Sequence, residues 1–238
     1  MRGTLAILIC LSVCGLAWAQ TPSLGQCPPY AQSIKLNFVT DNAPATLNNN
    51  LNATGLQNMA RLSGARVAGR HQRALGLTTS QVGLSLGGRT YAIPAKDGYC
   101  VYLSSVEAGF GYRRMDVMVA SEFPPGSCEY NAILDHENQH VAINRSTVRE
   151  YAPRVRQELE RLLQSVQPRF SRDPQLGSDD KLKALHDGLD PLLSEMERLL
   201  EARNAAIDTD YNYTAIGELC KNWNHGNIWS PVSPAPPR

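Results

Sequence analysis

The segment His136–His140 reads H-E-N-Q-H, an H-E-x-x-H motif in a chain with only five histidines. On an α-helix, residues i and i+4 share one face, so both imidazoles can bind one metal ion. Glu137 follows the first histidine and can take a proton from a water that the metal activates. The motif therefore predicts a zinc site with His136 and His140 as ligands and Glu137 as general base. The alternative is a helix that carries two surface histidines and a solvated glutamate.

The helix that carries this motif is expected to begin after the break at Phe123–Gly126. Ser127 is of a type that caps helices, and Glu129 would lie in the first turn, where the helix dipole favours negative charge. From there to about Val166, apolar residues recur with a period of 3.6. Pro153 should bend this helix or split it into two.

A loop over 168–177 then leads to a second predicted helix, from about 178 to 207, which Pro191 should kink or interrupt. The C-terminal half is therefore predicted to be a long helical hairpin, with the H-E-x-x-H motif near its open end.

A catalytic zinc site needs a third protein ligand, and the hairpin indicates where to look for it. About 28 residues separate His140 from Pro168, which at 1.5 Å per residue is roughly 42 Å. The same distance back along the second helix leads to Asp208, our preferred ligand. Asp210, two residues further on, and His225 are the alternatives. Helix-end and turn chemistry would also explain the two aspartates.

Two tyrosines, Tyr211 and Tyr213, lie in the same segment. A phenol beside the metal could stabilise the oxyanion that forms during amide hydrolysis. Half-buried packing is the alternative role for both residues.

The N-terminal half, from about 34 to 121, is expected to consist mostly of strands, because apolar and polar residues alternate there. Glycines 87 and 88 separate two such runs and predict a hairpin turn. Two further strands are expected at Tyr99–Val106 and Arg114–Ala120.

One helix is expected to interrupt these strands, with Leu47, Leu51, Met59 and Leu62 as its apolar stripe. The basic segment Gly64–Leu75 fits neither a helix nor a strand clearly.

These elements predict an α+β fold in which an antiparallel sheet packs on the helical hairpin. Residues 20–126 and 127–222 should form one domain, followed by a proline-rich tail over 223–238. The edge strand of the sheet would be the place for an extended peptide substrate.

Residues 1–19 have the features of a secretory signal peptide: Arg2, an apolar run and an Ala17-Trp18-Ala19 cleavage site. The mature protein is therefore expected to be exported, either periplasmic or secreted, without a membrane span. The chain has 23 basic and 22 acidic residues, and without Arg2 these balance at 22 each. The chain has no block of basic residues, so we expect no binding to nucleic acid.

Four cysteines remain after the signal peptide, an even number that predicts two disulfides in an exported chain. Cys128 begins the first long helix and Cys220 lies just past the end of the second. The hairpin should bring these ends together, so we expect a Cys128–Cys220 bridge. Cys27 and Cys100 would then pair within the strand-rich half.

The order of these motifs resembles a bacterial exported family described both as a domain of unknown function and as zincin-like metallopeptidases. The resemblance covers roughly residues 30 to 215. It rests on the strand Gly98–Tyr102 with its cysteine, the proline loop, the H-E-x-x-H helix and the aspartate of Ile207–Asp208. The family often continues with a threonine and a His-Gly pair, whereas this chain reads Thr209-Asp210-Tyr211. The resemblance implies a metal-dependent hydrolase and no particular substrate.

We therefore expect an exported zinc-dependent hydrolase of the metallopeptidase type that acts on a peptide or cell-envelope substrate. One alternative is a non-catalytic envelope or secreted protein whose metal site is structural or absent. A second is a peptidoglycan amidase, because a zinc-activated water can attack any amide.

Overall fold

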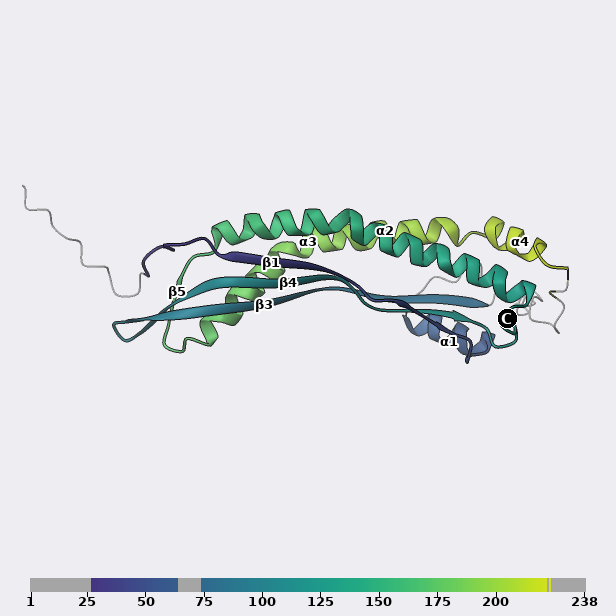
Figure 1. The fold of residues 1–238 in the computed structure, drawn as a ribbon, viewed down its shortest axis with the longest axis horizontal. Coiled ribbons are helices and arrows are strands. Elements are labelled where there is room, and N and C mark those ends of the chain that lie inside the picture. Colours follow the sequence, from purple (N-terminus) through teal and green to yellow (C-terminus); the bar gives the residue numbers. More distant parts are fainter. Residues whose placement is uncertain (1–26, 64–73, 222, 224–238) are drawn as a thin grey trace, which may run out of the picture.

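The computed structural model describes residues 27–63, 74–221 and 223. The predicted signal peptide, most of the basic segment after residue 63 and nearly all of the proline-rich tail lie outside this range. The molecule is elongated, with two long helices along one face of a twisted sheet and a short helix against the other face at one end (Figure 1).

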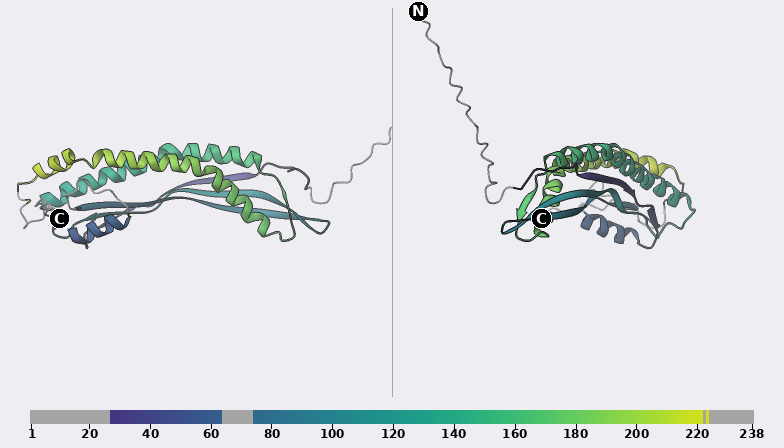
Figure 2. Two further views of the ribbon diagram at one scale, coloured as in Figure 1. Left: turned by 180° about the vertical axis from the view of Figure 1, so that it is seen from behind. Right: turned by 60° about the vertical axis from the view of Figure 1, so that its left-hand side comes forward.

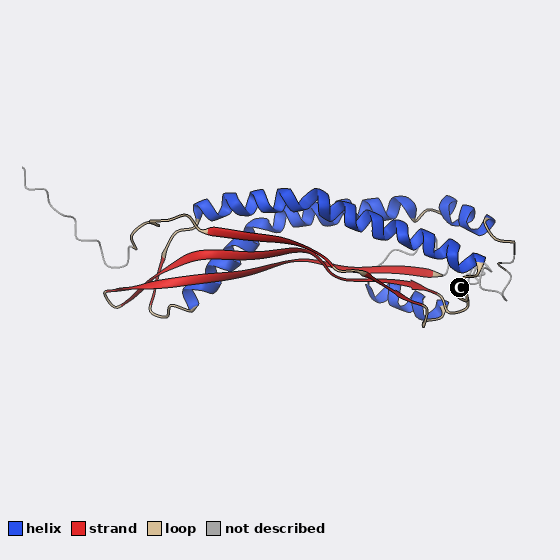
Figure 3. Ribbon diagram, viewed as in Figure 1, coloured by secondary structure: helices blue, strands red, loops and turns tan. Residues whose placement is uncertain are grey.

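Five strands and four helices make up the described part of the chain, as Figure 3 shows by colour. In chain order these elements are β1 (Lys35–Asn42), β2 (Ala45–Asn48), α1 (Ala53–Ser63), β3 (Gly76–Ala95), β4 (Gly98–Val119), α2 (Cys128–Ser165), β5 (Arg169–Ser171), α3 (Leu176–Ile207) and α4 (Asp210–Glu218).

The predicted antiparallel sheet is wrong, because the sheet is mixed. Strand β4 is central, and both β1 and β2 run parallel to it along one edge. Strands β3 and β5 pair antiparallel with β4. After β2 the chain passes through α1 and returns as β3 on the opposite edge, so that β4 ends up running in the direction of β1. An alternating pattern of apolar residues predicts a strand but carries no information about the direction of its partner.

The hairpin turn predicted at Gly87 and Gly88 is also wrong. Both glycines lie inside β3, and the chain turns instead at Lys96 and Asp97, where Asp97 has a φ of 66°. Gly88 allows α3 to approach the strand closely. A Cβ atom there would lie 3.0 Å from side-chain carbons of both Leu103 and Leu182.

The two strands expected at 99–106 and 114–120 are parts of the single long strand β4. The segment between them contains Gly111, which has a φ of 147° and pairs with Asp41 of β1. A Cβ atom at Gly111 would overlap the backbone carbonyl of Asp41. This glycine therefore marks a close contact between strands, and the strand continues through it.

Helix α1 buries a different face from the one predicted. Its buried residues are Ala53, Leu56 and Ala60, whereas Leu62 is 90% exposed. Leu47 lies in β2 and is half exposed. The predicted stripe combined residues of a strand and a helix, so its members do not share a face.

The helical hairpin forms as the sequence predicts, except that the loop expected over 168–177 contains the short strand β5 and the start of α3. Ser127 caps α2 by accepting a hydrogen bond from the Tyr130 amide at 3.1 Å, and the helix continues without a break past Pro153. Helix α3 contains Pro191, and Figure 2 shows that it bends near its middle. Its first half crosses the strands and its second half runs beside α2 (Figure 2).

The main hydrophobic core lies between the sheet and the two long helices, and it joins residues from both halves of the chain. Phe110 of β4 packs there with Leu159 of α2 and Leu189 of α3, all fully buried. A smaller core lies beneath α1 around Leu56 and Phe123.

Both predicted disulfides are confirmed. Cys27 is bonded to Cys100, with Cα atoms 5.5 Å apart, and Cys128 to Cys220, with Cα atoms 5.9 Å apart. These bridges are compatible with an exported protein. Within the described residues, no helix combines the length and the apolar character needed to cross a membrane.

We predict that Gly111→Ala destabilises the fold by about 2–4 kcal/mol, because a side chain there combines positive φ with backbone overlap. Gly83 pairs with Gly111 across β3 and β4, and a Cβ atom at Gly83 would meet only Arg113, at 3.8 Å. Gly83→Ala is therefore a matched control that should change stability by less than about 1 kcal/mol. Urea unfolding of both variants tests this, and equal losses would contradict the prediction.

Candidate metal centre

Three ligand atoms converge between the open ends of α2 and α3. His136 Nε2 lies 3.3 Å from His140 Nε2, and each nitrogen lies 3.1 Å from Asp208 Oδ1. In a tetrahedral zinc site with bonds of about 2.0–2.1 Å, the ligand atoms are about 3.3–3.4 Å apart. The triangle formed by these three atoms fits this geometry closely, so the group could hold a metal ion.

Local structure places each of the three residues. His136 and His140 are one turn apart on the buried face of α2. Asp208 is the residue at which α3 ends, and its backbone N–H still donates to the Asn204 carbonyl at 3.3 Å. The hairpin therefore returns Asp208 to the histidines. Asp210 begins α4 and does not belong to this cluster. The third candidate, His225, lies outside the described residues.

Asn204 determines which nitrogen of His140 faces the cluster as an acceptor. The Asn204 amide nitrogen donates to the Leu200 carbonyl at 3.0 Å, so its oxygen must face His140 Nδ1, which lies 2.8 Å away. That nitrogen must then carry a proton, so in the neutral imidazole, which is the form that binds metal, the lone pair is on Nε2. A histidine that binds a metal usually donates a hydrogen bond from its other ring nitrogen to an oxygen, as His140 does here.

The charges in the cluster favour a cation between the three atoms. Burial opposes ionisation of Asp208, but its hydrogen bonds with His136 and His140 hold its pKa well below the usual range. Burial would also lower the pKa of His140, but Asp208 and the neighbouring Glu137 carboxylate outweigh this effect and raise the pKa to about 9. A metal ion would compete with this proton, so metal binding should release it.

Glu137 lies on the side of α2 that faces β3. Its Oε2 accepts a hydrogen bond from the Thr78 hydroxyl at 2.7 Å, and its side chain is buried. Burial raises the pKa of Glu137, and the opposing effects of His140 and Thr78 offset this only in part. Gly76 makes the contact possible, because a Cβ atom there would overlap the Glu137 carboxylate and Ile133.

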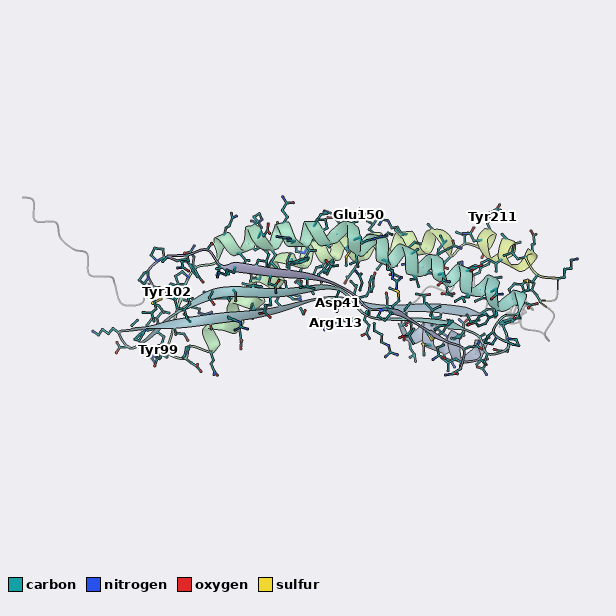
Figure 4. The ribbon with its side chains drawn as sticks, viewed as in Figure 1. Asp41, Tyr99, Tyr102, Arg113, Glu150 and Tyr211 are labelled. Carbon is teal, nitrogen blue, oxygen red and sulfur yellow. A yellow bond between two sulfur atoms is a disulfide. The ribbon has the colours of Figure 1, made fainter. Side chains whose placement is uncertain are left out.

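The structure separates the two tyrosines. Tyr213 donates a hydrogen bond from its hydroxyl to Asp208 Oδ1 at 2.8 Å, and its ring lies 5.3 Å from that of His136. Burial and the Asp208 charge raise the pKa of Tyr213, so the phenol stays protonated and remains a donor. Tyr211 is 81% exposed and points away from the helix pair (Figure 4).

Several residues that support the cluster were not predicted from the sequence. Asn144 donates to the His140 carbonyl at 2.8 Å and accepts from the buried Tyr112 hydroxyl at 3.0 Å. Asn144 and Asn204 could have been found, because each lies four residues from a ligand and so shares its helix face. No sequence pattern indicates Thr78, which reaches the site only because α2 packs on β3.

We predict that the purified mature protein holds one zinc ion per chain, as measured by elemental analysis. His136→Ala, His140→Ala and Asp208→Ala should each lower the affinity for zinc by at least about tenfold, because each removes one of three protein ligands. Asp210→Asn is the matched control and should retain the metal. Full zinc retention by the double variant His136→Ala, His140→Ala would refute this site.

We also predict that the Cys128–Cys220 bridge supports metal binding, because it joins the start of α2 to the segment that follows α4. In the chain-entropy model, closing a loop of this length stabilises the fold by about 4 kcal/mol. Replacing both cysteines with serine should weaken zinc binding about tenfold, as measured by competition with a chelator. The same replacement of Cys27 and Cys100 should leave zinc binding unchanged. Equal effects of the two replacements would argue against a local role for this bridge.

No protein-family model, curated protein or solved structure matches this chain. The family resemblance drawn from the motifs therefore stays a prediction, and the case for a function rests on the geometry of the cluster.

Proposed function

We propose that this protein is an exported, zinc-dependent hydrolase that cleaves peptide amides in the periplasm or after secretion. The convergence of His136 Nε2, His140 Nε2 and Asp208 Oδ1 carries the proposal. Two imidazole nitrogens and one carboxylate oxygen suit zinc, and three protein ligands leave one position of a tetrahedral site for water or substrate.

The surrounding residues have the properties that amide hydrolysis requires. Zinc bound by the three ligands would lower the pKa of its water and polarise the substrate carbonyl. Glu137, which follows the ligand His136 in the motif, is the proton acceptor and would later return the proton to the leaving amine. Thr78 holds one carboxylate oxygen of Glu137 and so orients the base. Tyr213 stays protonated, and its hydroxyl, which donates to Asp208 Oδ1, would hold this ligand in place.

A peptide substrate would bind along β3. This strand pairs only with β4 among the described strands, so its second backbone edge has unpaired hydrogen-bonding groups. Thr78 lies near the start of β3 and bonds to Glu137, the residue after His136, so this part of the strand lies near the metal cluster. An extended peptide that adds to the edge would pass beside the three ligands.

We predict that Glu137→Gln retains zinc but lowers kcat/KM by at least about 100-fold, because an amide cannot accept the proton. The control is Asp135→Asn, which removes one carboxylate from an exposed position two residues away on the same helix. Activity is measured on a panel of fluorogenic peptides and peptidoglycan fragments. Equal turnover by wild type and Glu137→Gln on any cleaved substrate would refute the role of Glu137.

Burial favours a second candidate, a structural metal site. His136 and Glu137 are each only 4% exposed, and the Glu137 carboxylate is already hydrogen-bonded to Thr78. A structural ion would stabilise the contact between α2 and α3, so its removal by a chelator should lower Tm sharply. For the hydrolase, chelation should abolish activity while the fold persists. Loss of the fold together with inactivity of the zinc-loaded protein on every substrate would favour the structural role.

A further inference from the structure

A groove of about 530 Å³ lies between α3 and β3, apart from the metal cluster. One wall is a stripe of α3 that includes Asp190, Leu193 and Glu197, which are close to one turn apart and so share a helix face. The opposite wall is the Gln81–Leu84 segment of β3, and Arg113 of β4 completes the lining. The residues of this groove take no part in the chemistry described above.

The β3 wall belongs to the strand whose second backbone edge is unpaired within the described residues. Val82 and Leu84 pack against the helix-facing core, so Gln81 and Gly83 face the opposite side of the sheet. A peptide that pairs with this edge would alternate its side chains in the same way. One set of its side chains would face α3, and the other set would face the side where Arg113 lies over Gly83.

The groove and the metal cluster lie a short distance apart along both walls. On β3, Gln81 is three residues, or about 10 Å, from Thr78, and Thr78 bonds to Glu137. On α3, Glu197 is seven residues, or again about 10 Å, before Asn204, and Asn204 bonds to His140. Two different elements thus give the same separation, which an extended peptide spans with about three residues.

The α3 wall of the groove is acidic. Glu197 is exposed and has no hydrogen-bond or ion-pair partner within the described part of the chain. Asp190 lies 3.3 Å from His186 and is also exposed. A side chain that enters between β3 and α3 near Gln81 therefore meets the Glu197 carboxylate, and the Arg113 guanidinium lies on the other side of the strand.

We propose that this groove is a specificity subsite that binds the substrate about three residues from the scissile bond and selects a basic side chain. Backbone pairing with the β3 edge holds the peptide, and Glu197 recognises the lysine or arginine. The inference rests on the proposed function in assigning the groove to a substrate, but the binding step itself needs no catalysis.

The test measures binding by the full chain carrying Glu137→Gln, which cannot consume the probe. The probes are two sets of fluorescein-labelled decapeptides of alternating alanine and serine. In the lysine set, each peptide carries one lysine at a different position, and in the matched glutamate set a glutamate takes its place. Fluorescence anisotropy should show about fivefold tighter binding of the lysine set at one position, the effect expected of an exposed ion pair. Adding Glu197→Gln should remove this preference, and Glu197→Lys should reverse it. Glu160→Gln removes an exposed carboxylate from α2 and should leave the preference intact.

The outcomes separate this inference from the proposed function. Lysine-selective binding that depends on Glu197 supports the subsite, even if the wild-type protein cleaves none of the peptides. In that case the proposed peptidase activity fails while the groove stands. Absence of binding by both sets, or a lysine preference that survives Glu197→Lys, overturns the subsite. Cleavage without any preference would overturn the subsite and leave the proposed function intact.

Discussion

The antiparallel contact between α2 and α3 is the constraint on which the candidate site depends. Arg203 of α3 bonds to Thr147 at 3.0 Å and to Glu150 at 2.8 Å on α2, and Tyr151 of α2 bonds to Glu195 at 2.9 Å. These contacts set the register of the two helices. A shift by one residue would rotate Asp208 by about 100° around α3 and move it away from the histidines.

The sheet imposes the second constraint, because α2 must lie on β3 closely enough for Glu137 to reach Thr78. Gly76 allows this approach, since any side chain there would occupy the place of the Glu137 carboxylate. Burial raises the pKa of Glu137. In the proposed reaction it would also restrict the route to this carboxylate, and a peptide would approach along the edge of β3 that is unpaired among the described strands.

Sequence patterns were most informative where the chemistry is local. The H-E-x-x-H spacing, the Ser127 cap and the two helices of the hairpin all depend on contacts within a few residues, and the structure contains each of them. Helix lengths pointed to the segment that contains Asp208 and Asp210, because the rise per residue of a helix is constant, and the structure brings Asp208 to the histidines. The hairpin also brings Cys128 beside Cys220, as expected.

Local patterns were thus sufficient to place the two histidines on one face of α2, to give the length of the hairpin and to pair the cysteines. The direction of the strands, the turn at Lys96 and Asp97, and the contact of Thr78 with Glu137 depend on the packing of distant segments. The physical reason is that an alternating pattern is the same in parallel and antiparallel strands, and a glycine has the same side chain in a turn as at a close contact. Which partner lies opposite such a residue depends on segments far away in the chain. For Gly88 that partner is Leu182, ninety-four residues later in the sequence.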